Sequence, residues 1–326
     1  LQASKFYRQA IELAPELSEI EQQAIAAYQE TVYANPQADF KQYHHLATLL
    51  RSKSFFSEAI SAYQKAIELN PEFLGAYYAI QYTHVAPEQL DRLIDFYRSI
   101  VEKHPHIDIA WGNLGDALAE RGKIEEAINC YQTSCYQRTI AVYPHLAELD
   151  WKKPKQNAPD FIVIGAAKCG TSSLFNYLKS HPQILLPHKK ELNFFGAKLK
   201  YSLDWYLAHF PSISDRPEFI TGEATPNYIR FPQAATQIKA HFPKFKLIVL
   251  LRNPIDRSLS WHHHKLNSGL AKGTFAEAVA YEIKQLESFS EEDFKKTIYH
   301  NPDNILGSLY LYKLKIWMKL FEPEQF

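Results

Sequence analysis

The chain has 326 residues, 46% of them hydrophobic and 22% charged, which is the composition of a globular protein with room for about two domains. No apolar run approaches the ~18 residues of a membrane span, and the three cysteines form no CxxC pair, which favours a cytoplasmic, reducing compartment over a disulfide scaffold. The net charge of zero hides two opposite halves. Residues 1–150 carry 12 Lys+Arg and 20 Asp+Glu, hence −8, and residues 151–326 carry 24 and 16, hence +8. The basic half suits a polyanionic ligand.

Tyrosines recur at a nearly constant interval in the acidic half. Tyr63, Tyr97 and Tyr131 are 34 residues apart, and Tyr28 lies 35 before Tyr63. Around them the sequence has helical periodicity, and "YRQAIELAP" at 7–15 predicts one more helix of the same kind. A fixed period of this length indicates a helical repeat.

The stretch "AWGNLGDALAERGKIEEAINCYQ" at 110–132 predicts two helices joined at Gly122, with Gly115 and Ala127 small enough for close helix contact. In these positions it resembles the tetratricopeptide repeat (TPR) family. The resemblance covers roughly residues 1–145 and is weakest at 76–95. It implies an all-α solenoid domain, placed at 1–147, whose concave face binds a protein or peptide partner. A structural or dimerising role is the alternative.

A proline-containing stretch, "ELDWKKPKQNAPD" at 148–160, predicts a linker, and the remainder, 161–326, alternates strands with helices. Such alternation predicts an α/β domain with a central parallel sheet. Strands are expected within 160–165, 218–224 and 245–252, and helices at 172–180, 203–209, 232–241, 274–287 and 305–321.

The first strand leads into "GAAKCGTSS" at 165–173 and then into a helix. Two glycines permit a tight turn, Lys168 supplies a positive charge, and the helix start presents amide groups, so the loop is suited to phosphate. Helix capping by one hydroxyl is the alternative. The Walker pattern GxxxxGK[ST] is not matched, because Thr171 rather than lysine follows Gly170. A kinase is therefore disfavoured.

A second polar segment, "LLRNPIDRSLSWHHH" at 250–264, follows the last predicted strand. Arg252 at the strand end can bind a phosphate through two hydrogen bonds, and Ser260 lies about two helical turns into the next helix. Arg257 is interpreted as a solvated or salt-bridged residue of that helix.

Together, "AAKCGTSSL" and "RNPIDRSLSW" resemble the nucleotide-binding signatures of the sulfotransferases that use 3′-phosphoadenosine 5′-phosphosulfate (PAPS). The resemblance implies PAPS as co-substrate and no metal. It implies that the first loop holds the 5′-phosphosulfate and the second the 3′-phosphate. The positions that it assigns to the nucleotide are Lys168, Cys169, Gly170, Thr171, Ser172 and Ser173 in the first loop, and Arg252 and Ser260 in the second.

Two further stretches, "PHKKELNFFG" at 187–196 and "GEATPNYI" at 222–229, resemble the carbohydrate sulfotransferases of the heparan sulfate type and their bacterial relatives. There the glutamate of a Glu-x-x-Phe-Phe stretch is the general base, which implies that role for Glu191. Lys168 then stabilises charge on the leaving group. A surface glutamate paired with Lys189 or Lys190 is the alternative for Glu191.

The resemblance also assigns a role beside the acceptor to His264, although a surface or structural histidine is the alternative. Three adjacent histidines on a helix cannot face one site, so a metal cluster is not expected. Ala224 stands where animal relatives often have lysine.

These relatives continue beyond the last predicted helix, so we expect weak or no PAPS turnover from a chain that ends at Phe326 and activity from the full-length protein. The acceptor is expected to be a glycan, with protein or a small molecule as alternatives, and no nucleic-acid partner is predicted. The competing function is a TPR adaptor whose second domain binds nucleotide without catalysis.

Overall fold

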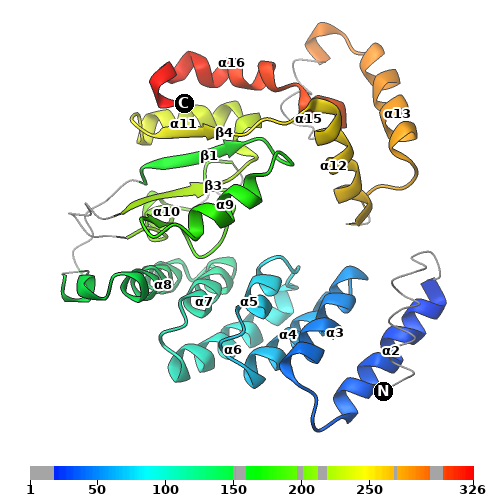
Figure 1. The fold of residues 1–326 in the computed structure, drawn as a ribbon, viewed down its shortest axis with the longest axis vertical. Coiled ribbons are helices and arrows are strands. Elements are labelled where there is room, and N and C mark those ends of the chain that lie inside the picture. Colours follow the sequence, from blue (N-terminus) through cyan, green and yellow to red (C-terminus); the bar gives the residue numbers. More distant parts are fainter. Residues whose placement is uncertain are drawn as a thin grey trace. The chain divides into compact units, whose positions relative to one another are not determined.

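The computed structural model describes residues 18–149, 151, 159–196, 201–211, 219–267, 270–293 and 304–326 (Figure 1). The chain divides into two compact units between Ser134 and Cys135. The helix predicted at 7–15 and most of the predicted linker lie outside the described residues.

The first unit is an all-α solenoid, as predicted, in which consecutive helices lie side by side (Figure 1). Three pairs, α3–α4, α5–α6 and α7–α8, follow the repeat. The helices are α2 (Ser18–Ala34), α3 (Phe40–Ser52), α4 (Phe56–Leu69), α5 (Leu74–Gln81), α6 (Leu90–Lys103), α7 (Asp108–Glu120) and α8 (Ile124–Val142), which extends past the division between the units.

The repeated tyrosines occupy equivalent buried positions. Tyr63, Tyr97 and Tyr131 are all 1% exposed or less. A Cβ added to Gly115 would lie 2.6 Å from the ring of Tyr131, so glycine is required for α7 to approach α8 this closely. The Tyr131 hydroxyl also donates to Asp116 at 2.9 Å. The 34-residue spacing thus reflects one packing arrangement that recurs along the solenoid.

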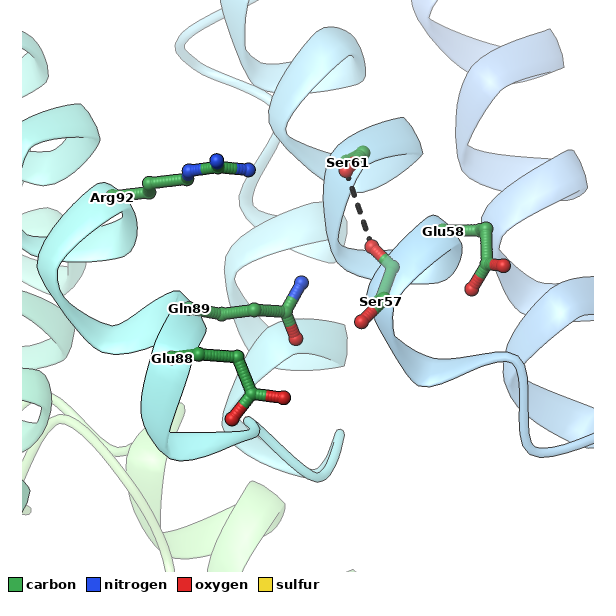
Figure 2. A pocket seen from close by; sticks show the side chains of 6 residues that line it. All are labelled: Ser57, Glu58, Ser61, Glu88, Gln89 and Arg92. Atoms are coloured by element: carbon green, nitrogen blue, oxygen red, sulfur yellow. Dashed lines mark hydrogen bonds between the residues drawn. The ribbon is translucent and has the colours of Figure 1, made fainter.

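The irregular repeat predicted at 76–95 has a structural counterpart. Helix α5 ends at Gln81, and a short 3-10 helix, η1 (Pro87–Gln89), precedes α6. Beside it lies a polar cavity of about 460 Å³ (Figure 2). Its lining comes from α4, η1 and α6 and comprises Ser57, Glu58, Ser61, Glu88, Gln89 and Arg92.

The second unit contains a four-stranded parallel sheet of order β2-β3-β1-β4, which confirms the predicted fold class. Its strands are β1 (Phe161–Gly165), β2 (Ile184–Leu185), β3 (Ile220–Ala224) and β4 (Lys246–Val249). β2 was not predicted, because two residues carry no periodicity. The helices are α9 (Thr171–Lys179), α10 (Leu203–Leu207), α11 (Pro232–His241), α12 (Pro254–Asn267), α13 (Phe275–Glu287), α15 (Asn304–Ser308) and α16 (Tyr310–Leu320).

The central strand β1 is buried along its whole length, as expected of a strand with a continuous apolar sequence. Its residues Phe161 and Val163 pack with Phe175 of α9 and with Ala224 of β3. This core fixes the start of α9 against the carboxyl end of β1, the edge at which open parallel sheets bind their ligands.

The single helix predicted at 305–321 is wrong, because the chain breaks between α15 and α16 at Leu309. The buried side chain of Lys313 donates to the carbonyl oxygens of Leu306 at 2.7 Å and Gly307 at 3.0 Å. Burial, with a smaller contribution from Arg257, lowers the pKa of Lys313 to about 7. These carbonyls at the end of α15 are therefore satisfied by a side chain instead of by a continued helix.

Candidate active site

The loop after β1 has an unusual backbone. Lys168 (φ +70°) and Gly170 (φ +88°) both adopt the left-handed conformation that contributes to anion-binding loops. A Cβ at Gly170 would meet no described atom within 4 Å, so the protein leaves the space beside this residue open. α9 begins directly afterwards at Thr171.

The amides at the start of α9 are not capped by a side chain, because the N-cap residue is Gly170 and no side-chain cap bond forms there. The alternative of simple hydroxyl capping is therefore not what the structure has. Thr171 is buried, whereas Ser172 and Ser173 are exposed on the first turn. The helix start thus presents amide and hydroxyl donors on which an anion could bind.

The two predicted nucleotide segments lie side by side. The amide of Ala166 donates to Leu250 O, and the amide of Leu250 donates to Gly165 O, both at 2.8 Å. Tyr310 joins the segments a second time, because its hydroxyl donates to Arg252 O at 3.1 Å and lies 3.4 Å from the Cys169 sulfur.

Within the second segment, Arg252 is exposed and Ser260 is partly exposed on α12. The side chain of Asn253 accepts from the amides of Ile255 at 2.9 Å and Asp256 at 3.4 Å, which caps the start of α12. Arg252 is thereby left at the carboxyl end of β4 with its side chain toward solvent.

Arg257 was interpreted as a solvated or salt-bridged helix residue, and the structure shows that it is not solvated. Its side chain is 2% exposed, and its guanidinium donates to Ala167 O and Asn304 O, each at 3.3 Å. It also lies over the ring of Trp261, 5.3 Å from the centroid, and fills the space beside Gly307, where a Cβ would be 1.9 Å from Nη1. Arg257 connects the first loop, α12 and α15.

Glu191 forms an ion pair with Lys190, with 2.5 Å between Nζ and Oε1. The two side chains are 35% and 9% exposed, respectively, so the pair is partly buried. Glu191 thus has the lysine partner that the surface alternative expected, although its side chain is only partly exposed. Glu191 (φ +67°) and Asn193 (φ +55°) are left-handed, which is uncommon for residues other than glycine.

The pKa values of two predicted catalytic residues, Lys168 and His264, both depend on the third, Glu191. Burial is the main cause that lowers the pKa of Lys168, with Arg257 and Lys190 adding to it and Glu191 opposing it. Burial also lowers the pKa of His264, where Lys168 adds to the effect and Glu191 again opposes it. Lys168, Glu191 and His264 come from three segments, and Glu191 raises the pKa of each of the other two side chains against the effect of burial.

The three adjacent histidines have different environments. His262 is buried, and its Nε2 lies 3.3 Å from Gly273 O, whereas His263 and His264 are exposed. His264 packs near Trp261, with 5.4 Å between ring centroids. Among the residues that the structure describes, no group of three His, Cys, Asp or Glu side chains could hold a metal ion.

Sequence reasoning missed two residues that shape this region: Tyr310 as the link between loops, and Glu223. The carboxyl of Glu223 on β3 is 1% exposed and accepts from the hydroxyls of Thr225 at 2.7 Å and Tyr228 at 3.0 Å. A glutamate inside a strand flanked by apolar residues was the only available signal for the last of them.

A parallel sheet with a glycine-containing loop between its central strand and a helix defines a P-loop-like α/β domain. The family described as "Sulfotransferase domain" matches residues 158–326, and the family described as "Tetratricopeptide repeat" matches residues 43–73 and 109–138. The chain belongs to the sulfotransferase domain family and carries TPR repeats in its first unit.

Several characterised proteins are similar to the second unit. Membrane-associated sulfotransferase kil1 of Dictyostelium discoideum is 41% identical over 109 residues, 33% of this chain and 23% of that protein. Bifunctional heparan sulfate N-deacetylase/N-sulfotransferase 1 of Caenorhabditis elegans is 29% identical over 178 residues, 52% of this chain and 20% of that protein. The chain therefore covers less than a quarter of the length of these relatives.

A solved structure, a sulfotransferase from Alicyclobacillus acidocaldarius, is 30% identical with a TM-score of 0.43, and the similarity covers 52% of this chain and 71% of that one. Within the described residues, none of the helices combines the length and the apolar character that crossing a membrane requires.

Proposed function

We propose that this protein transfers a sulfuryl group from PAPS to a hydroxyl or amine of an acceptor, with a glycan as the acceptor class. The observation that carries the proposal is the open, left-handed loop at the carboxyl end of β1, which is joined by hydrogen bonds to the segment of Arg252. The amide of Glu191 is bonded to Ala224 O at the end of the neighbouring strand β3. Family membership supports the same chemistry.

The donor would be held at two places. The amides at the start of α9, with Lys168 and the hydroxyls of Ser172 and Ser173, suit the 5′-phosphosulfate, and exposed Arg252 with Ser260 suits the 3′-phosphate. The bonds between the two segments support simultaneous binding, because they fix the spacing of the two anion sites. PAPS supplies the activated sulfuryl group.

Glu191 would accept the proton of the acceptor as the new O–S or N–S bond forms and the S–O bond to the 5′-phosphate breaks. Lys168 would stabilise the negative charge that moves onto the phosphate oxygen of the leaving 3′-phosphoadenosine 5′-phosphate (PAP). His264 would bind the acceptor or share its proton, and its lowered pKa keeps the imidazole neutral near pH 7.

Two observations support a glycan acceptor. The excess of +8 charge over residues 151–326 favours an anionic acceptor, and a relative that matches this half carries heparan sulfate in its name. The acidic first unit would bind a protein or peptide partner, which is the usual role of TPR solenoids.

Calorimetry with PAP and with ATP tests the donor site. We expect PAP to bind and ATP not to bind, and the reverse result would favour a kinase-like nucleotide site. Lys168→Ala should weaken PAP binding, whereas Lys179→Ala, an exposed lysine at the other end of α9, should leave it unchanged.

Transfer of labelled sulfate from PAPS to a panel of glycans tests the reaction itself. Glu191→Gln should reduce kcat at least 100-fold, the contribution of a general base being about 10²–10⁴-fold, with unchanged PAP affinity. Binding of PAP without any transfer to hydroxyl or amine acceptors would favour the inactive adaptor instead, and full activity of both Lys168→Ala and Glu191→Gln would refute the assigned roles.

A further inference from the structure

We infer that Glu223 is a positioning residue for the sulfuryl-transfer site, whose buried carboxylate holds the segment 191–195 and thereby orients Glu191. The inference rests on the proposed function for the meaning of Glu191, but the contacts on which it depends are independent of that function.

The carboxylate of Glu223 lies at the centre of a closed set of hydrogen bonds. It accepts from the Thr225 hydroxyl at 2.7 Å, the Tyr228 hydroxyl at 3.0 Å and the Tyr206 hydroxyl at 3.4 Å. Three hydroxyl donors, two from residues just after β3 and one from α10, therefore converge on one buried side chain.

The end of β3 and two of the residues that bond to Glu223 also hold the backbone of residues 191–195, the base segment, along its length. The amide of Glu191 donates to Ala224 O at 3.0 Å, that of Asn193 to the Thr225 hydroxyl at 3.3 Å, and that of Phe195 to the Tyr228 hydroxyl at 3.3 Å. Three of the five amides from 191 to 195 are therefore bonded to β3 or to the residues after it.

These bonds matter because the segment has a backbone that would not persist alone. Glu191 and Asn193 are both left-handed, a conformation that is unfavourable by about 1–2 kcal/mol for each residue with a Cβ. Strained backbone at a functional site persists when the surrounding structure holds it in place. Thr225 and Tyr228 each bond both to Glu223 and to the segment, so the carboxylate fixes the hydroxyls that fix the segment.

The environment of Glu223 suits a hydrogen-bond acceptor that is held in one orientation. Burial raises the pKa of Glu223 to about 7, while the hydrogen bonds from Thr225, Tyr228 and Tyr206 oppose that rise. These bonds favour the ionised form of the carboxyl against burial, and each of them also orients a neighbouring hydroxyl.

Glu223→Gln tests the inference, because glutamine keeps the shape but loses the charge that accepts the three hydroxyl bonds. We expect kcat for sulfate transfer to fall by between about 10- and 100-fold through misplacement of Glu191, while the dissociation constant for PAP changes less than twofold. Hydrogen–deuterium exchange should become faster in the peptide that covers 188–196 and stay unchanged in β1 and α9.

Two variants control for a general structural effect. Thr221→Val removes an equally buried hydroxyl of β3 that bonds to Leu185 O at 2.7 Å, and it should leave kcat and the 188–196 exchange unchanged. Tyr228→Phe should act in the same direction as Glu223→Gln, and it decides the matter if Glu223→Gln does not fold.

The outcomes separate this inference from the proposed function. Absence of sulfate transfer by the unaltered protein would count against the proposed function, while the exchange measurement would still test the role of Glu223. Unchanged exchange at 188–196 in Glu223→Gln or Tyr228→Phe would overturn the inference. So would a fall in kcat that Thr221→Val reproduces.

Discussion

Replacement of Arg257 by methionine should destabilise the second unit by about 2 kcal/mol. Within the part of the chain that the structure describes, the change removes two charge-assisted hydrogen bonds, to Ala167 O and Asn304 O. At 3.3 Å each is long, so each is assigned ~1.5 kcal/mol, the lower end of the usual range. Methionine recovers part of that sum, roughly 1 kcal/mol, because a buried charge no longer has to be desolvated and the thioether packs on Trp261. In the variant, Asn304 O still accepts hydrogen bonds from the hydroxyls of Ser258 and Ser308. Most of the lost stability therefore comes from the Ala167 carbonyl, which loses its bond to the guanidinium.

Urea unfolding followed by tryptophan fluorescence measures the effect, because four of the five tryptophans belong to the second unit. A loss of ~2 kcal/mol corresponds to a fall in Tm of roughly 4–8 °C for a unit of this size. Arg121→Met is the matched control: Arg121 pairs with Asp91 at 2.9 Å on the surface, and an exposed pair contributes about 0–1 kcal/mol. If Arg257→Met unfolds at the urea concentration of the unaltered protein, the hydrogen bonds do not outweigh the desolvation of the guanidinium and the reasoning is refuted.

Tyr310→Phe should weaken PAP binding by roughly 2- to 10-fold in calorimetry, because it deletes one hydrogen bond of ~0.5–1.5 kcal/mol to Arg252 O. The control Tyr312→Phe should leave PAP binding unchanged. Equal PAP affinity in the unaltered protein and both variants would exclude a link between the loops. Gly170→Ala should lower the free energy of unfolding by only ~1–2 kcal/mol, because alanine is strained at this positive φ. It should also weaken PAP binding, because its Cβ would occupy the open space beside the loop. Retained PAP affinity would show that the anion does not approach this residue. The pKa of Glu223 is about 7 in the folded protein and about 4.5 in the unfolded chain, so the folded state binds a proton on this carboxyl more readily. Its contribution to the free energy of unfolding is therefore fully present below pH 4.5. It is lost as the pH rises to 7, by on the order of 3 kcal/mol. Glu223→Gln should remove that slope from urea unfolding measured between pH 5 and 8, and an identical slope in both proteins would contradict the raised pKa.

The parts of the site that could be predicted are those in which a local pattern has a local cause. A strand that turns into a helix through Gly170 requires a residue without a Cβ at positive φ, and this requirement is visible in the sequence. The 34-residue spacing of Tyr63, Tyr97 and Tyr131 likewise repeats one packing contact. The parallel sheet followed from alternating apolar runs and helices.

The parts that could not be predicted depend on contacts between distant segments. Arg257 has the sequence environment of a surface helix residue, and only the approach of Gly307, fifty residues later, shows that it is buried. Lys313 was expected inside a continuous helix, and its bonds to the carbonyls of α15 end that helix instead. Long cationic side chains are usually solvated, so composition gives no warning when a fold uses one to satisfy backbone carbonyls.

The two glutamates of the site show how the same residue type acquires different tasks from its surroundings. Glu191 is partly exposed beside Lys190, so a cation and solvent stabilise its charge and its carboxylate can meet an acceptor. Glu223 is buried among hydroxyl donors, so its charge depends on groups that it simultaneously orients. Three amides between 191 and 195 are bonded to β3 or to the residues after it, so we expect a change at the buried carboxylate to reach the exposed one through this backbone. In the proposed mechanism, the placement of Glu191 therefore depends on β3 as much as on the loop that carries it.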